Sequence, residues 1–365
     1  MSDTMPDPLL VPVFDGHNDT LTRIYGAQGA EHSSFLDRGA SGHLDLPRAR
    51  EAGLVGGFCA IFAPSPNYEL TEQPVLGDDG EAIPGRWTVA LPPKLDRRSA
   101  YAFTLSVMSE LFRMVERSDG EVEVVRSASD LERCVEAGTF AIILHIEGAE
   151  ALDTRLETLD LFHEAGLRSL GPVWSRPNAF GHGVAFDFPG HPDVGAGLTA
   201  AGRRLVKRCN ELGVLVDLSH LNARGFWDVA KISNAPLVAT HSNAHALCPS
   251  PRNLTDAQLD IVALSGGLVG LNYAVSFLRA DGQERSETGI SEIAKHARYI
   301  ADRIGVRHVG LGSDFDGAMI PSDLGGVTGL PQLLDALRNV GFSETEVRSI
   351  AYDNWIRVLR DTWGA

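Results

Sequence analysis

The sequence has few cysteines and no long apolar run. Cys59, Cys134, Cys209 and Cys248 are far apart and form no Cys-x-x-Cys pair, which argues against a disulfide framework or a zinc–thiolate site. No stretch approaches the roughly 20 apolar residues that span a bilayer. The N-terminal MSDTMPDPLLVPVF also lacks the basic start and the apolar segment of a secretion signal. We therefore expect a cytoplasmic protein with no membrane partner.

Positive charge is scarce. The chain has 32 Lys and Arg residues and 48 Asp and Glu residues, which gives a formal net charge of −16. A nucleic acid or an anionic membrane surface would favour a basic face, so neither partner is expected. Internal repeats and low-complexity tracts are lacking too. With 44% hydrophobic and 22% charged residues, the 365-residue chain is typical of a globular protein, and we expect a single domain over residues 1–365.

Eight short apolar runs alternate with helical patterns along the chain. They span residues 11–14, 53–63, 140–146, 167–174, 214–219, 236–241, 267–273 and 308–313. Nearly continuous apolar strands separated by helices are typical of a parallel sheet covered on both faces. Eight such units predict an α/β fold of the (β/α)8, or TIM-barrel, type. A doubly wound sheet would favour Gly-x-Gly-x-x-Gly after the first strand, where the sequence has FDGHND.

Two polar segments rich in Gly and Pro interrupt the alternation. Residues 64–97, after the second predicted strand, form the longest irregular region, and insertions of this length are often functional. We expect this insertion to be a lid over the site or part of a subunit interface. The second segment spans about 175–197. Near the C-terminus, Ser343 and Glu346 have the spacing of a capping box, which predicts that a closing helix begins there.

Imidazoles and carboxylates recur where the predicted strands end. They are His17 and Asp19 on the first strand, His145 and Glu147 on the third, Asp217 and His220 on the fifth, His241 on the sixth, and Asp314 and Asp316 on the eighth. Each alone has an ordinary explanation, such as a turn in DGHND. A barrel, however, brings the carboxyl ends of its strands together, which predicts a shared metal site. Nitrogen and oxygen ligands without thiolate suit zinc or a similar divalent ion.

Two carboxylates close to these candidate ligands, Asp15 and Asp217, have expected roles of their own. Asp15 precedes His17 by two residues and therefore shares its face of the strand, so we expect it to support that histidine. Asp217 precedes His220 by three residues, so we expect it to point away from that ligand and to be buried structure.

Five stretches, DGHND, HIEGAE, DLSH, THSNAHALCPSPRN and VGLGSDFDG, occur in this order between about residues 12 and 360. In them the sequence resembles the renal, or membrane, dipeptidase family of zinc peptidases (family M19), a branch of the amidohydrolase-type barrels. The resemblance implies a metal-dependent hydrolase that cleaves L-Xaa–L/D-Xaa dipeptides. It also implies two zinc ions per subunit, a hydroxide that bridges them as the nucleophile, and a homodimer.

The resemblance implies a role for each matching residue. The metal ligands would be His17 and Asp19 for one zinc ion, His220 and His241 for the second, and Glu147 bridging the two. Asp314 matches the aspartate that transfers a proton to the leaving amine, a general acid/base role. Arg252 in SPRN matches the arginine that binds the terminal carboxylate of the substrate, to which a planar guanidinium is suited.

One position departs from the family pattern. Animal members have a histidine near the end of the fourth strand that polarises the scissile carbonyl, whereas the aligned GPVWSRPN places Trp174 there. His182 in FGHG is the nearest replacement, and polarisation by a zinc ion is the alternative. Trp174, Tyr273 and Asn243 are candidates for contact with the substrate.

The departure at Trp174 puts the substrate range in doubt more than the reaction type. Hydrolysis of another amide, such as an N-acyl-D-amino acid, therefore stays open. A barrel that only binds a ligand through a vestigial site is a third hypothesis, and the complete set of strand-end ligands argues against it.

Overall fold

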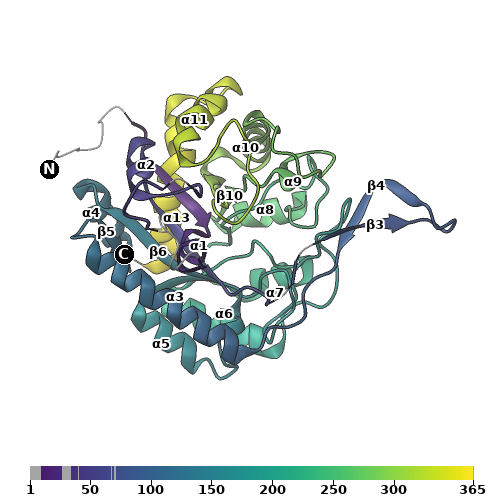
Figure 1. Cartoon of the computed structure of the whole chain (residues 1–365), viewed down its shortest axis with the longest axis horizontal. Helices are drawn as coiled ribbons and strands as arrows, with labels where there is room; N and C mark the ends of the chain where they lie inside the picture. Colours follow the sequence, from purple (N-terminus) through teal and green to yellow (C-terminus); the bar gives the residue numbers. More distant parts are fainter. Residues whose placement is uncertain (1–9, 27–33, 40, 67, 70, 365) are drawn as a thin grey trace.

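The computed structural model describes residues 10–26, 34–39, 41–66, 68–69 and 71–364. The first nine residues, on which the expectation about a secretion signal partly rests, lie outside the described residues. Eight parallel strands form a nearly closed barrel with helices around it (Figure 1). Its strands are β1 (Val13–Asn18), β2 (Leu54–Phe62), β6 (Phe140–Glu147), β7 (Leu167–Gly171), β8 (Leu215–Val216), β9 (Val238–Ala239), β10 (Leu268–Leu271) and β11 (Val309–Leu311).

The strand order is β8-β7-β6-β2-β1-β11-β10-β9, and a bridge between Asp217 and Val238 joins the two ends. Every strand of this path lies in or overlaps one of the eight predicted apolar runs. The predicted TIM barrel is therefore confirmed. A short additional strand, β5 (Val122–Val124), pairs with the first half of β6.

Thirteen α-helices occur in the described part of the chain. They are α1 (Thr20–Gly26), α2 (Leu46–Glu51), α3 (Arg97–Arg117), α4 (Ala128–Ala137), α5 (Glu157–Ala165), α6 (Ala200–Leu212), α7 (Ala223–Ile232), α8 (Asp256–Leu264), α9 (Val275–Leu278), α10 (Ser291–Ile304), α11 (Leu330–Asn339), α12 (Glu344–Arg348) and α13 (Asn354–Trp363). None of them combines the length and the hydropathy that a membrane-spanning helix needs.

The sequence explains where several of these helices begin and end. Thr199 accepts a hydrogen bond from the backbone of Gly202 at the start of α6, and Gly213 ends that helix in the left-handed conformation. Ser343 and Glu346 form the predicted capping box at α12. A single turn of π-helix then connects α12 to α13. The predicted closing helix therefore consists of α12 and α13 joined by this turn.

Helix α13 closes the end of the barrel opposite the carboxyl ends of the strands. The indole of its fully buried Trp355 packs against Phe14 of β1 and Phe58 of β2 and donates to the Leu311 carbonyl at 2.9 Å. A Cβ on Gly310 would lie 2.7 Å from this indole, so a side chain there would displace it. The barrel is thus a packed core rather than a pore, and its opposite end is left for the polar residues.

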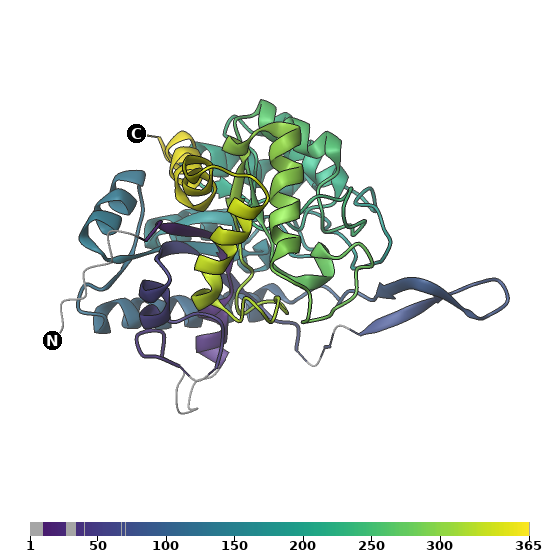
Figure 2. The same cartoon turned by 90° about the horizontal axis from the view of Figure 1, so that it is seen from above.

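The insertion after β2 contains a regular hairpin, which corrects the expectation of an irregular segment. Strands β3 (Glu72–Leu76) and β4 (Ala82–Val89) pair antiparallel. This hairpin, the arm, projects away from the barrel in both views (Figures 1 and 2). Its root is held by Trp87, whose ring stacks on Phe188 of the second polar segment at 4.6 Å, with backbone hydrogen bonds in both directions. Alternation of polar and apolar residues in 86–89 was the overlooked signal.

Candidate active site

Four of the predicted metal ligands meet around one carboxylate at the carboxyl ends of the strands. Glu147, the last residue of β6, places Oε1 2.9 Å from His220 Nε2, 3.4 Å from His241 Nε2 and 3.7 Å from His17 Nε2. Asp19 Oδ2 lies 3.5 Å from the same His17 nitrogen. Glu147 therefore lies between a His17–Asp19 pair and a His220–His241 pair, in the position predicted for a bridging ligand.

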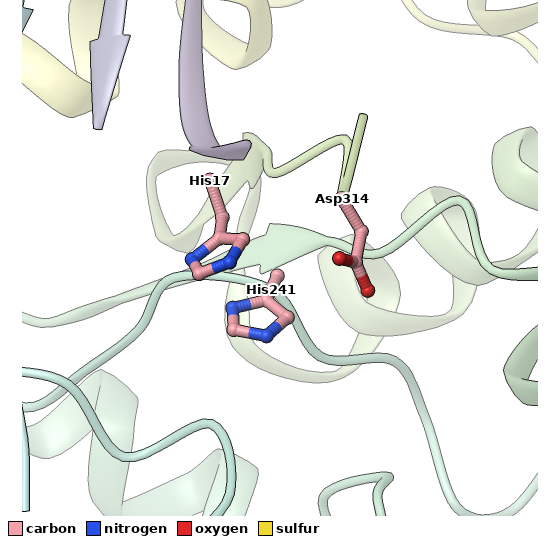
Figure 3. A group of neighbouring side chains, drawn as sticks. All are labelled: His17, His241 and Asp314. Atoms are coloured by element: carbon pink, nitrogen blue, oxygen red, sulfur yellow. The ribbon is translucent and has the colours of Figure 1, made fainter. Parts of the chain in front are cut away.

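The imidazoles of His17 and His241 stack at 3.8 Å between centroids, and the Asp314 carboxylate lies beside them (Figure 3). Ligand atoms of these three residues lie within 4.8 Å of one another. Three strand ends, those of β1, β9 and β11, thus contribute to this part of the cluster. The ladder β9-β10-β11-β1 fixes their spacing.

The ionisation of the cluster matches a cation site. Burial alone would lower the pKa of His17, but the surrounding carboxylates of Glu147 and Asp19 raise it to about 10. Burial also raises the pKa of Glu147 well above its usual range. The shift at His17 indicates that the surrounding carboxylates favour positive charge at the centre of this buried pocket. A bound divalent ion would supply that charge.

The other two histidines favour the neutral form. Burial, and then the positive charges of Arg252 and His17, lower the pKa of His220 well below its usual value. Burial and the same neighbours do so for His241. Neutral imidazole is the form that binds metal ions. In His17, moreover, both ring nitrogens are buried and find no hydrogen-bond partner in the part of the chain that the structure describes. These observations fit the donor set to a metal centre.

Asp314 lies beside the cluster on a strained loop after β11. Its φ is +60°, in the left-handed region that non-glycine residues rarely adopt. Asn272 donates from Nδ2 to Asp314 Oδ2 at 2.9 Å. Gly317 allows the close approach of two carboxylates, because a Cβ there would lie 2.6 Å from Asp314 Oδ1 and nearer still to Asp19 Oδ2. Asn272 and Gly317 were not predicted as site residues.

Hydroxyl groups hold the second nitrogen of two candidate ligands. Ser175 Oγ lies 3.0 Å from His220 Nδ1, and Thr240 Oγ1 lies 2.8 Å from His241 Nδ1. Each contact leaves Nε2 directed at Glu147. Neither hydroxyl was predicted from the sequence. The one available signal was proximity to a candidate ligand, as for Thr240, which directly precedes His241.

Asp15 and Asp217 both support the cluster. Asp15 accepts from the backbone amides of His17 and Ser313 and does not contact the imidazole. It therefore ties the end of β1 to the loop after β11. Asp217 is buried, as predicted, and its Oδ2 lies 3.9 Å from His241 Nδ1 and 3.7 Å from His145 Nε2. These contacts with His241 and His145 were not predicted.

Charge and hydrogen bonds keep Asp217 ionised. Burial alone would raise its pKa, but His145 and the hydrogen bonds from Ser219 and Thr240 lower it.

Asp316 instead contacts residues of α1. Its carboxylate accepts from Thr20 Oγ1 at 2.7 Å and pairs with Arg23 at 2.8 Å.

A cavity of about 650 Å³ opens onto the cluster. Its floor includes the four residues Asp19, Glu147, His220 and Asp314. One wall is aromatic, with Phe62, Trp174, Phe186 and Phe277 among its members. Neighbouring rings of this wall are 5.1 to 6.3 Å apart. The root of the arm reaches the cavity through Glu72, Trp87 and Val89.

Of the predicted substrate contacts, Trp174 is the one that lines this cavity. Asn243 and Tyr273 are fully buried, and the Asn243 amide donates to the carbonyls of Asn272 and Phe277. His182 is not among the described residues that line the cavity, so the geometry gives no support to its catalytic role.

Arg252 is buried next to the cluster rather than exposed in the cavity. Its Nη atoms donate to the carbonyls of Ser219 and His241, and its guanidinium lies 5.5 Å from the centroid of Phe277. Nε has no hydrogen-bond partner among the described residues. Arg252 therefore holds the segments that carry His220 and His241, which sequence reasoning did not predict.

Known proteins are similar to this chain in sequence and fold. The model of the membrane dipeptidase family (peptidase family M19) matches residues 9–363. A metallopeptidase from Rhodobacter sphaeroides, solved with a phosphinate mimic of the dipeptide L-Ala-D-Ala, is 48% identical with a TM-score of 0.90; the match covers 97% of this chain and 100% of that one. The structure of dipeptidase AC, a metallopeptidase of the same family, is 48% identical with a TM-score of 0.89, over 97% and 99% of the two chains.

A more distant relative carries the same activity name. The dipeptidase tcpJ of Claviceps purpurea is 27% identical over 95% of this chain and 76% of its own length. These matches agree with the chemistry of the buried His, Asp and Glu cluster. The chain belongs to the membrane dipeptidase family, peptidase family M19, and is a metallopeptidase of that family.

Proposed function

We propose that the protein is a zinc-dependent dipeptidase that binds two zinc ions. The observation that carries this proposal is the position of Glu147 Oε1, within 3.7 Å of His17, His220 and His241. His17 and Asp19 would hold one ion, His220 and His241 the other, and Glu147 would bridge them. When bound, the ions supply Lewis acidity and lower the pKa of a coordinated water towards 7.

The chain's own residues would orient the substrate and move the proton. Asn272 binds Oδ2 of Asp314, which leaves Oδ1 free to take a proton from the attacking water and to pass it to the leaving amine. As the family resemblance implies, Arg252 is the candidate group for the terminal carboxylate of a dipeptide, and its buried Nε has no hydrogen-bond partner among the described residues. By the resemblance, Trp174 stands where animal members of the family have the carbonyl-polarising histidine, and a bound metal ion would supply that polarisation in place of His182.

The test measures cleavage of L-Ala-D-Ala and zinc content on the same samples of full-length protein. We expect wild type to carry about two zinc ions per chain and to cleave the dipeptide. His241→Ala should lose at least one ion and the activity, since a buried ligand is removed. His163→Ala, on the outer helix α5, is the matched histidine control and should retain both. Near-normal turnover by His241→Ala would contradict the proposal.

Another amide substrate is the second candidate, and the aromatic wall favours it. With Trp174 in place of a polar residue, the cavity presents apolar rings that would also accept an acyl chain. Comparing free-amine dipeptides with N-acetyl-D-amino acids decides between the two. The relatives with dipeptidase names support the dipeptide as the substrate.

The family resemblance also supports a homodimer, which sedimentation of the purified protein would test.

A further inference from the structure

Beneath the candidate metal ligands, a hydroxyl connects a buried carboxylate to His241. Thr240 Oγ1 lies 2.6 Å from Asp217 Oδ2 and 2.8 Å from His241 Nδ1. All three residues are at most 3% exposed. Because the three groups form a short chain that excludes solvent, the direction of each hydrogen bond depends on its neighbours.

The number of protons fixes these directions. A carboxylate can only accept, so Thr240 must donate its single hydroxyl proton to Asp217. The hydroxyl oxygen can then only accept from His241, which requires the proton on Nδ1. The remaining ring nitrogen, Nε2, is left with its lone pair directed at Glu147, 3.4 Å away.

We propose that Asp217 is a positioning residue that selects, through Thr240, the tautomer in which His241 can bind a metal ion. The relevance of this tautomer rests on the proposed role of His241 as a ligand, but the tautomer itself can be measured without any metal. A hydrogen-bonded outer group that fixes the tautomer of a ligand histidine is a common device, and its loss typically lowers metal affinity about 10- to 100-fold.

His220 is held differently, which offers an internal contrast. Ser175 Oγ lies 3.0 Å from His220 Nδ1, but no carboxylate among the described residues hydrogen-bonds to that serine. The Ser175 hydroxyl can therefore rotate to donate or to accept. We infer that the tautomer of His241 is imposed and that of His220 is not.

Asp217→Asn should reverse the hydrogen-bond chain rather than merely remove it. Oδ1 of Asp217 accepts from the backbone amides of Ser219 and Thr240 at 3.0 and 2.9 Å and from the Ser219 hydroxyl. An asparagine must keep its carbonyl oxygen there, so its amide nitrogen would face Thr240. The amide would donate to the Thr240 hydroxyl, which would then donate to His241 Nδ1 and place the ring proton on Nε2.

The first measurement is the tautomer of His241 in metal-free protein, from the nitrogen chemical shifts of its assigned imidazole. We expect Nδ1–H in wild type and Nε2–H in Asp217→Asn. Thr240→Val, which removes the hydroxyl at nearly constant volume, should give a mixture, and Thr240→Ser should restore the wild-type state. An unchanged tautomer in Asp217→Asn, or equal behaviour of Thr240→Val and Thr240→Ser, would overturn the proposal.

The second measurement is zinc affinity by competition with a chelator. Affinity for at least one ion should fall about 10- to 100-fold in Asp217→Asn and Thr240→Val and return in Thr240→Ser. Asp45→Asn is the control, since Asp45 is an equally buried carboxylate that caps α2 instead. If Asp217→Asn does not fold, the two Thr240 variants carry the test. Absence of zinc from wild type would refute the proposed function, while the tautomer result would still decide this inference.

Discussion

The floor of the cavity and the arm that borders it are stabilised in opposite ways. On the floor, Glu147 and the histidines around it are buried, and hydroxyl groups hold the second ring nitrogens of His220 and His241. The arm is a two-stranded sheet whose residues are largely exposed, and an isolated hairpin of this kind is only marginally stable in water.

The contrast extends to what each region tolerates. A floor residue contacts several strand ends, so moving one side chain moves the others. The arm contacts the body mainly at its root, through the stack of Trp87 on Phe188. We therefore expect the chemistry to depend on the floor and substrate access to depend on the root of the arm.

Among substitutions that compare the floor with the arm, the largest expected effect comes from adding one methyl group to the floor. In Gly317→Ala, the new Cβ would lie 2.6 Å from Asp314 Oδ1 and nearer still to Asp19 Oδ2, so both carboxylates must shift. Misplacement of a reacting group by about 1 Å can cost on the order of 10²-fold in rate. We expect kcat/KM for L-Ala-D-Ala to fall by about that factor, with weaker zinc binding.

The matched substitution in the arm is Gly80→Ala. Gly80 has a φ of +81°, but a Cβ added to it would meet no described atom within 4 Å, so alanine adds local backbone strain and no clash. We expect unchanged zinc content and kcat/KM. If Gly317→Ala and Gly80→Ala had the same activity, the contrast between floor and arm would be wrong.

An intermediate effect is expected at the root of the arm. Trp87→Ala removes the stack on Phe188 and should destabilise the root by roughly 3 kcal/mol, the cost typical of large-to-small changes of buried aromatics. Hydrogen exchange should accelerate in residues 72–89 and hardly elsewhere. KM should rise several-fold while zinc content stays constant. Loss of zinc in this variant would show that root and floor are coupled.

The smallest effect is expected on the outer part of the arm. Leu76 is 59% exposed, and Leu76→Asp should change the free energy of unfolding by no more than about 0.5 kcal/mol, with unchanged kcat/KM. Chemical denaturation and steady-state kinetics measure both quantities. A change in oligomeric state on sedimentation would instead identify this part of the arm as a subunit contact.

Much of the fold could be predicted because its signals are local. Each barrel strand is a short apolar run, and the capping box at Ser343 begins a helix where predicted. The arm was missed because its Pro and Gly content left only a short alternation, in 86–89. Asp217 is buried as predicted, but its contacts with His145 and His241 depend on the neighbouring strand ends and were not predicted.

The site was predicted less evenly. His17, Glu147, His220 and His241 are brought together as expected, since a parallel barrel places successive strand ends on one rim. Thr240, Ser175 and Asn272 were missed because a hydroxyl or an amide carries no pattern of its own. Each of them matters only because of the side chain with which it forms a hydrogen bond.

The sequence by itself determined the barrel fold and the types of side chain, His, Asp and Glu, that could bind a metal ion. Both follow from properties of short segments: apolar periodicity and polar residues at the strand ends. Only the tertiary structure decided which side chains are joined by hydrogen bonds or lie close enough to interact electrostatically. Asp217, Thr240 and His241 form one chain of hydrogen bonds across two strand ends, and Arg252 holds the backbone near two ligands. Such couplings depend on distances of about 3 Å between segments far apart in sequence, which local patterns do not contain.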